Sequence, residues 1–481
     1  MLLCRNCCYG LVVVVLAAAG VANAQNSGIL PPNLARRHGL DRVWATQVEV
    51  GRDRGGVVHV TPQVSSTRKQ TVFDVVHAAG VLSISEQQLS PQGRPFGIDG
   101  ARKYAEDRVK EFATKQPLNT DPPRIEMREV PEITLYAATS LGAVHAIDAE
   151  TGKTKWVTAL GNLNYPMSEV AANDNYVVYM NGSSVFVLDS LDGKLIWTHR
   201  SAGVAAAGPA VTDTHLFLPT VVGSMEVRLL ASTRETAWHY RAGGKTRVPP
   251  VGSSDSVAWT TDRGQLIVAA ADPRAIRFRL EAKQPFYASP AFAGVSRVVA
   301  ATVDGFVHCM DRTSGGVLWK TAVGDRCFAA PYCVGDSVLI LTEGHDLVCL
   351  NLQNGLEQWR TIGIRLVLAS SAEKLYCAGD IGRMLILDSK NGARISTVET
   401  EEFDLQVVNS LTDRIYLGNR GGTLQCLREI GNRWPIVHVN RESESDEKPA
   451  TTPRSKTNQG TNEDPFATPK TNAGEDPFAN P

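Results

Sequence analysis

The stretch LYAATSLGAVHAID (residues 135–148), continued by TGKTKW (residues 151–156), decides the fold of this chain. It contains two short apolar runs separated by Gly142, and then Asp148, Gly152 and Trp156 at intervals of four residues. A similar unit returns about every 41 residues, and its aromatic positions are Trp156, Trp197, Trp238, Phe278, Trp319 and Trp359. A period near 40 residues built from short strands and tight turns is typical of a β-propeller.

The polar and glycine positions of the unit are predicted to form turns. An Asp or Asn side chain accepts hydrogen bonds from turn amides, and a glycine four residues later adopts a left-handed conformation without a Cβ clash. The aromatic residue that follows begins an outer strand and packs against the neighbouring blade. Beyond the first unit, these turn positions are Asp189, Gly193, Asp311, Gly315, Asn351, Gly355, Asp388 and Gly392. Residues that depart from the pattern are Arg234, Arg274, Phe278 and Ser396.

Counting the units predicts an all-β propeller of eight four-stranded antiparallel blades, with seven blades as the alternative. The units begin near Ile133, Tyr176, His215, Ser256, Arg297, Ser337, Lys374 and Arg414. A ring usually closes by borrowing a strand from the other end of the chain, which removes an exposed edge. Residues 43–48, which include Trp44, are the preferred closing strand, and residues 433–437 could instead complete the last blade locally.

The N-terminal residues 1–24 are predicted to be a secretory signal peptide. Arg5 precedes an apolar run from Leu11 to Val21, and Ala24 ends a small-residue exit. Such a run is shorter than the roughly 20 residues that a transmembrane helix needs. We therefore expect cleavage after Ala24, a periplasmic or secreted protein, and no transmembrane segment after cleavage.

Six cysteines follow the signal peptide. Cys309, Cys349 and Cys426 occupy one position of three different units, where they are expected to be buried small side chains. Cys327 and Cys333 lie on one segment between blades, and the sequence leaves open whether they form a disulfide.

Residues 25–130 are predicted to form an α+β decoration that also contains the closing strand. Residues 57–64, 71–78 and 81–87 are β-prone and suggest a β-meander with Gly80 in a turn. Residues 101–114 show a helical period, with Asp99 as the N-cap and Pro117 after the last turn. Because the polar face of this helix mixes both charges, we expect it to pack on the protein rather than lie on a membrane.

The C-terminal residues 439–481 are predicted to be disordered, because they are rich in polar residues and proline and contain few apolar ones. They carry the peptide EDPFA twice. Two such peptides on one tether could bind a partner with avidity, or the segment could serve only as a solubilising tail. The candidate partner-binding residues are Asp464, Pro465, Phe466, Asp476, Pro477 and Phe478.

The remaining composition excludes several classes of function. The formal net charge is −1, which argues against electrostatic capture of nucleic acid. The ten histidines show no metal-ligand spacing, and no phosphate-binding loop or nucleophile motif is present. The repeat aspartates are turn residues by position. The sequence thus predicts no catalytic, cofactor-binding or metal-binding residue, and no cofactor.

Residues 146–156 resemble the repeat Ala-x-Asp-x-x-Thr-Gly-x-x-x-Trp of the quinoprotein-type propellers, and the resemblance extends over residues 131–438. That family includes PQQ dehydrogenases and the BamB-like lipoproteins of outer-membrane protein assembly. The dehydrogenases hold their quinone with a vicinal Cys-Cys pair, which is absent after residue 24. No cysteine follows the apolar run directly, so this chain also departs from the lipoprotein pattern.

Together with the export signal, the absent quinone-binding pair and the doubled EDPFA peptide, the resemblance predicts a non-catalytic propeller that binds protein partners in the cell envelope, with BamB-like duty in outer-membrane protein assembly as its most specific form. We expect it to be a monomer. The alternative that it leaves open is a degenerate quinoprotein oxidoreductase, or a binder of small molecules in the central channel.

Overall fold

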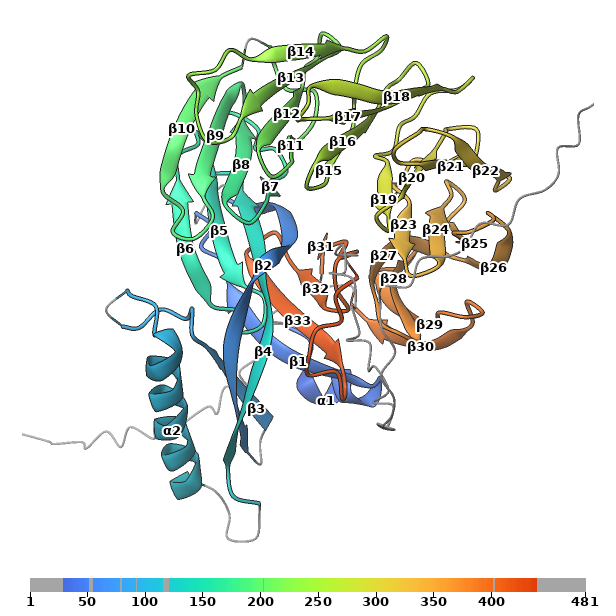
Figure 1. The fold of residues 1–481 in the computed structure, drawn as a ribbon. Coiled ribbons are helices and arrows are strands. Elements are labelled where there is room, and N and C mark those ends of the chain that lie inside the picture. Colours follow the sequence, from blue (N-terminus) through green and yellow to red (C-terminus); the bar gives the residue numbers. More distant parts are fainter. Residues whose placement is uncertain are drawn as a thin grey trace, which may run out of the picture. The chain divides into compact units, whose positions relative to one another are not determined.

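The structure is a computed structural model that describes residues 29–51, 55–77, 80–91, 93–115, 121–201, 203–400 and 403–438. The predicted signal peptide and the predicted C-terminal tail lie outside these residues and stay predictions. Within the described residues, eight antiparallel sheets follow one another around a ring, seven with four strands and one with five (Figure 1). The all-β propeller class predicted from the repeat is confirmed.

Blades 1 to 8 are numbered along the chain, and each is an antiparallel sheet. The strands of blades 1 to 3 are β2 (Val57–His77), β3 (Gly80–Ser85), β4 (Arg124–Thr139), β5 (Ala143–Asp148) and β6 (Thr154–Ala159); β7 (Ala171–Ala172), β8 (Tyr176–Asn181), β9 (Ser184–Asp189) and β10 (Leu195–Arg200); and β11 (Ala210–Val211), β12 (His215–Pro219), β13 (Ser224–Leu229) and β14 (Trp238–Arg241). The strands of blades 4 to 6 are β15 (Val251–Gly252), β16 (Ser256–Thr260), β17 (Gln265–Ala270) and β18 (Ala275–Glu281); β19 (Ala291–Ala293), β20 (Arg297–Ala301), β21 (Phe306–Asp311) and β22 (Val317–Ala322); and β23 (Tyr332–Val334), β24 (Ser337–Leu341), β25 (Asp346–Asn351) and β26 (Glu357–Ile362). The strands of blades 7 and 8 are β27 (Ile364–Ser370), β28 (Lys374–Gly379), β29 (Arg383–Asp388) and β30 (Arg394–Glu399); and β31 (Leu405–Gln406), β32 (Ile415–Gly418), β33 (Thr423–Glu429) and β1 (Leu40–Gln47).

The strand that completes blade 8 comes from the N-terminal part of the chain. β1 pairs antiparallel with β33, and Trp44 lies opposite Cys426. The alternative closing segment, residues 433–437, makes only an isolated bridge between Val437 and Thr412. The short helix α1 (Pro32–Arg37) precedes β1 and begins with a proline, which suits the first turn of a helix.

The core consists of apolar side chains that adjacent blades share. Cys309, Cys349 and Cys426 are fully buried among them, as the sequence predicted. Cys327 and Cys333 are both free thiols, so the disulfide considered for them is not formed in this structure.

The predicted three-stranded β-meander is confirmed only in its second pairing, of β2 with β3 near Gly80, and its first turn is wrong, because residues 57–77 form one strand. β2 pairs with β4 along almost its whole length, and the register shifts between Val64 and Lys69, so residues 65–68 form a bulge opposite Glu132, next to Pro131. A proline cannot donate a ladder hydrogen bond, and the bulge accommodates that break without ending either strand. The predicted boundary at residue 130 consequently falls inside β4.

The outer halves of β2 and β4, together with β3, form an arm that carries the helix α2 (Gly97–Lys115). The apolar face of the helix packs on the arm, where Ala101 and Ala105 contact the cluster of Phe73, Val75 and Ile84. Figure 1 shows the arm extending away from the ring. The predicted helix is present and starts two residues before Asp99, while Pro117 lies outside the described residues. Among the described residues, no helix is both long and apolar enough to cross a membrane.

Candidate functional site

Five tryptophans of the repeat each connect one blade to the next. Trp156 on β6 donates its indole N–H to the carbonyl oxygen of Ser190 in blade 2, at 3.0 Å. Its ring covers Gly193, where a Cβ atom would lie 2.5 Å from the indole. Gly193 also has a φ of 70°, so both the backbone conformation and the space require glycine. The other indole donors of this kind are Trp44, Trp197, Trp319 and Trp359.

The repeat aspartates hold the turns that receive these tryptophans. Asp148 accepts hydrogen bonds from the backbone N–H groups of Glu150 and Thr151, at 3.0 and 2.8 Å, through one carboxylate oxygen. The equivalent side chains that also accept from turn amides are Asp189, Asp311, Asn351 and Asp388. Each of these side chains accepts hydrogen bonds from the amides of its own turn, so its role is structural.

Two departures from the repeat have local explanations. Arg274 stands where a turn glycine was expected, and its guanidinium lies 4.0 Å from the centre of the Trp238 ring, so a cation–π contact replaces the usual one. Ser396 stands where an aromatic residue was expected, and its hydroxyl lies 2.6 Å from Nδ1 of His38, which precedes the closing strand.

A buried group of charged side chains, which sequence reasoning missed, joins the first blade to the last. The carboxylate of Glu150 contacts Arg128 of β4 at 2.6 Å and Arg414, which directly precedes β32, at 3.2 Å. Arg128 also pairs with Asp74 at 2.8 Å, and Arg414 with Asp413 at 3.1 Å. All five side chains are almost completely buried. They hold the arm, blade 1 and blade 8 together at the point where the ring closes.

The pKa of Glu150 predicts a loss of stability in acid. Burial alone would raise this pKa, but the charges of Arg414 and Arg128 outweigh burial and lower the pKa to about 2. Because the folded-state pKa lies below the ordinary value of 4.5, the contribution of Glu150 is fully present above about pH 4.5 and is lost as the pH falls toward 2. We expect this carboxylate alone to remove about 3 kcal/mol over that range. Urea unfolding between pH 2.5 and 6 measures this loss. The variant Glu150→Gln should be less stable at every pH, but its free energy of unfolding should fall less steeply as the pH is lowered.

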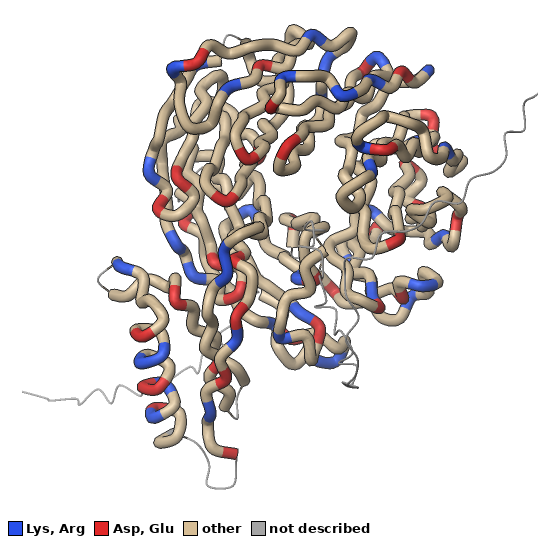
Figure 2. Tube along the Cα trace, viewed as in Figure 1, with Lys and Arg blue, Asp and Glu red and all other residues tan. Residues whose placement is uncertain are grey.

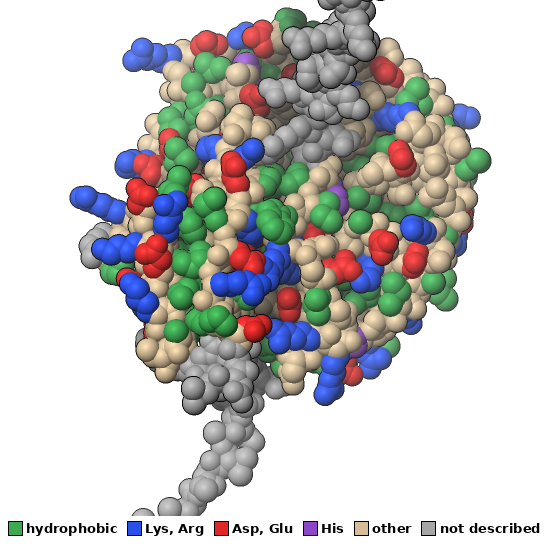
Figure 3. Space-filling model, turned by 60° about the horizontal axis from the view of Figure 1, so that its bottom comes forward, with side chains coloured by type: hydrophobic (Ala, Val, Ile, Leu, Met, Phe, Trp, Pro, Cys, Tyr) green, Lys and Arg blue, Asp and Glu red, His purple; other side chains and the backbone are tan. Residues whose placement is uncertain are grey.

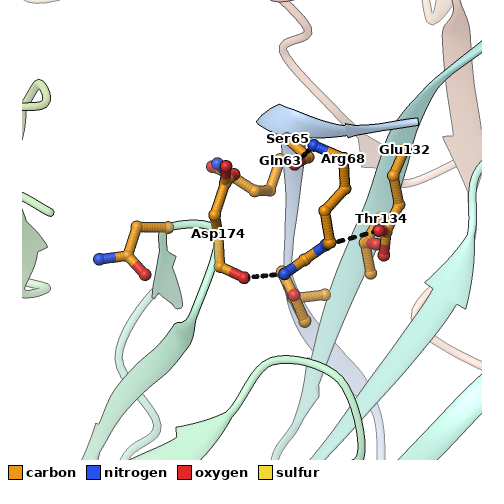
Figure 4. Close-up of a pocket in the computed structure, with 8 residues that line it drawn as sticks. Gln63, Ser65, Arg68, Glu132, Thr134 and Asp174 are labelled. Carbon is orange, nitrogen blue, oxygen red and sulfur yellow. Dashed lines mark hydrogen bonds and ion pairs between the residues drawn. The ribbon is translucent and has the colours of Figure 1, made fainter. Parts of the chain in front are cut away.

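A shallow polar depression lies between blades 1 and 2 (Figure 4). Arg68, in the bulge of β2, contacts Glu132 at 2.7 Å and also bonds the carbonyl oxygen of Asp174. The Asp174 carboxylate accepts from the hydroxyls of Ser66 and Thr67, at 2.6 and 2.7 Å. These side chains bind one another across the two blades, so the depression anchors the bulge to blade 2.

One end of the blades, which we call the linker face, carries the turns between the second and third strands of each blade and the linkers from one blade to the next. Backbone hydrogen bonds tie most of these turns to a neighbouring linker in a recurring way. For example, the N–H of Val221 donates to the carbonyl oxygen of Val204 at 3.0 Å, and that of Glu343 to Arg326 at 2.8 Å. The loops of this face are therefore held by the fold rather than only by their ends.

Exposed apolar side chains are numerous on the linker face. Val222, Ile362 and Ile381 are 76, 70 and 68% exposed. The other exposed large apolar residues of this face are Leu160, Leu163, Tyr165, Val204, Val221, Tyr287 and Phe328. Tyr287 and Phe328, from successive linkers, have stacked rings with centres 6.3 Å apart. Among the described residues, the opposite end has somewhat fewer, namely Leu191, Leu195, Val295, Val317, Leu356, Val408, Ile430 and Trp434.

The charges of the protein are distributed without separation by sign. Lys, Arg, Asp and Glu alternate around the blades and along α2 (Figure 2). In the space-filling view, basic and acidic side chains are interspersed with hydrophobic ones (Figure 3). In the part of the chain that the structure describes, no group of three or more His, Cys, Asp or Glu side chains is placed to hold a metal ion.

The candidate site residues of the C-terminal tail, Phe466 and Phe478 with their Asp and Pro neighbours, lie outside the described residues. Sequence reasoning placed no functional residue on the linker face. The linker face could have been found in the sequence from the apolar residues in its turns and linkers, such as Val222 and Ile381, where polar residues are usual.

The chain is similar to a set of known proteins. The family model described as "Outer membrane protein assembly factor BamB" matches residues 118–225 and 267–415. A protein of that name from Burkholderia pseudomallei (strain K96243) is 26% identical over 250 residues, which are 47% of this chain and 62% of the relative. Another from Yersinia pestis is 25% identical over 260 residues, which are 47% of this chain and 63% of the relative. The match thus spans less than two thirds of the length of these curated relatives.

A solved structure supports the same fold. The crystal structure of BamB from Moraxella catarrhalis superimposes with a TM-score of 0.52 at 17% identity, and the match covers 61% of this chain and 91% of that one. The resemblance seen in the repeat is confirmed. Because the family model matches slightly more than half of the residues, the chain belongs to the family described as outer membrane protein assembly factor BamB.

Proposed function

We propose that this protein is a non-catalytic platform that binds protein partners in the cell envelope and serves the assembly of outer-membrane proteins. The linker face carries the proposal, because it presents exposed apolar side chains on loops that backbone hydrogen bonds hold in place. Exposed apolar patches rimmed by polar residues are typical of interaction sites. The names of the relatives indicate the process.

The chemistry of the blades supports a platform rather than an enzyme. The repeat aspartates are engaged by turn amides, as at Asp148 and Asp311. The buried carboxylates of Asp74 and Glu150 are paired with guanidiniums at the ring closure. The mixed distribution of charge favours protein partners over nucleic acid. We propose that the propeller acts as a monomer in the periplasm or outside the cell.

The proposal is tested by placing charges on the linker face. The double variant Val204→Asp with Val222→Asp should reduce rescue of folded outer-membrane protein levels in cells that lack the native protein, and weaken partner co-purification about tenfold. Leu191→Asp with Leu356→Asp is the matched control, since these side chains are 59 and 66% exposed at the opposite end. Equal effects of the two double variants, at unchanged melting temperature, would contradict the use of this face.

The same assay addresses the C-terminal tail. We propose that its two EDPFA peptides add a second contact to the partner, and a chain that ends at Asn440 removes both. Weaker co-purification of that chain, with an unchanged melting temperature, supports a tethered second contact, whereas undiminished binding assigns the interaction to the propeller alone.

A further inference from the structure

One turn of the linker face departs from the other seven. Its counterparts each contain a glycine with positive φ, and these glycines are Gly142, Gly182, Gly223, Gly264, Gly305, Gly382 and Gly422. Blade 6 has His345 there, with a φ of 64°, and among the described residues it is the one non-glycine residue with positive φ. A side chain in this conformation is strained, and such outliers cluster at functional sites. The imidazole at this position therefore calls for a functional explanation.

His345 does not fill a core. Its Nδ1 lies 2.5 Å from a carboxylate oxygen of Asp380, in the corresponding turn of blade 7, and both side chains are nearly half exposed. The turn itself is held, since the backbone N–H of Ile364 donates to the carbonyl oxygen of His345 at 2.9 Å. When the imidazole is neutral and Nδ1 donates to Asp380, Nε2 carries a lone pair. The pair then offers two acceptors, Nε2 and the second carboxylate oxygen.

Two exposed aliphatic side chains flank this pair. Ile362 ends β26 and Ile381 lies beside Asp380, and both are about 70% exposed. The linker between blades 6 and 7 is a single residue, Gly363, so little backbone separates these two blades. A Cβ atom on Gly363 would lie 3.6 Å from the second carboxylate oxygen of Asp380, which places this linker next to the acceptors.

The charges around the pair are mixed. Asp325, Glu343, Asp346 and Asp380 lie in or beside the adjoining linker and turns together with Arg326, Arg360, Arg365 and Arg383. Of these, Arg326 pairs with Glu343 and Arg360 with Asp346. Asp325 is itself turned toward the site of His345, because it accepts a hydrogen bond from the N–H of Gly344 at 2.8 Å. A cationic donor is the complement of the Asp380 carboxylate and of an acceptor at Nε2 of His345.

We propose that His345, Ile362, Asp380 and Ile381 form the docking corner for a protein segment that carries a Lys or Arg next to an aliphatic side chain. The cation donates to Asp380 and to Nε2 of His345, while the aliphatic side chain packs between the two isoleucines. This inference rests on the proposed use of the linker face and adds the place and the chemistry of one partner segment.

The test is photocrosslinking of the full chain in its native host, with benzoylphenylalanine at position 381 and, as a control, at Leu356 on the opposite end of blade 6. We expect a discrete protein adduct at 381 alone, whose crosslinked peptide has a Lys or Arg within about two residues of an aliphatic one. In this background, His345→Gly and Asp380→Asn should each lower the adduct yield about tenfold.

His345→Gly separates a functional role from a structural one. Because glycine is relaxed at positive φ, we expect this variant to raise the melting temperature by about 1–2 °C while it loses the adduct. A lower melting temperature would mean that His345 serves the fold, and an unchanged adduct yield would show that it does not contact the partner; either overturns the proposal.

Other occupants have distinguishable outcomes. An adduct with a lipid, with a second copy of this chain or with an acidic segment would overturn the chemistry proposed for the corner. A parallel photocrosslinker at Val222 separates the two proposals. An adduct at 222 without one at 381 leaves the platform in place and removes the docking corner, whereas no adduct at either position removes both.

Discussion

Arg414→Met will lower the free energy of unfolding by about 3–5 kcal/mol, the range expected when one partner of a buried ion pair is removed. The guanidinium of Arg414 is completely buried and contacts Glu150 and Asp413, and it donates to the carbonyl oxygen of Arg433 at 2.8 Å. Methionine fills similar space without a charge, so the lost stability reports the lost pairing of Asp413 and Glu150 with Arg414 rather than a cavity, while Glu150 keeps Arg128. Equilibrium unfolding in urea at pH 7 measures it.

A surface ion pair supplies the matched control for this variant. Arg36 pairs with Asp41 at 3.1 Å, but its side chain is 57% exposed. Exposed pairs contribute about 0–1 kcal/mol, so Arg36→Met should leave stability nearly unchanged. A loss for Arg414→Met as small as that of the control would show that the buried group at the ring closure contributes nothing that apolar packing cannot replace.

Gly193→Ala will cost about 2–5 kcal/mol, because two penalties coincide at this residue. Its φ of 70° is unfavourable for a residue with a Cβ atom, by about 1–2 kcal/mol. The added Cβ would also lie 2.5 Å from the Trp156 ring, and overpacking of that kind costs about 1–3 kcal/mol. Thermal or urea unfolding of the variant gives the sum of both.

Gly324→Ala separates the two penalties. Gly324 has a φ of 87°, but nothing lies within 4 Å of a Cβ atom placed there. This variant should therefore show the backbone penalty alone, about 1–2 kcal/mol. If both alanine variants lost the same stability, Trp156 would have to move aside freely, and the packing between blades would not depend on the turn glycine.

The sequence predicted those features that depend on local chemistry. The turn residues Asp148 and Gly152 repeat with a fixed spacing, and the strands β8, β12, β16, β20, β24 and β28 begin at the predicted residues. The bulged strand β2 was missed, since Pro131 and the polar residues 65–68 resemble a break, and only the long ladder with β4 shows that the strand continues.

The buried charges could not be predicted for a different reason. Glu150 and Arg414 are 264 residues apart, and nothing local marks the turn residue Glu150 or Arg414, at the start of the last unit, as buried or paired. Only ring closure brings them together. The same limit applies to His345, whose conformation becomes apparent when the eight turns are compared in space, although its place in the repeat, where other units have glycine, was a signal in the sequence itself.

The pairing of β1 with β33 has a consequence for the order in which the protein becomes complete. β1 precedes every other strand of the ring in the sequence, yet its partner strand ends at Glu429. A chain interrupted anywhere before that residue leaves β1 with an open edge and the ring without its final contact. The ring can therefore close only in an intact chain. An incomplete chain exposes a strand edge that proteases and quality-control factors can recognise.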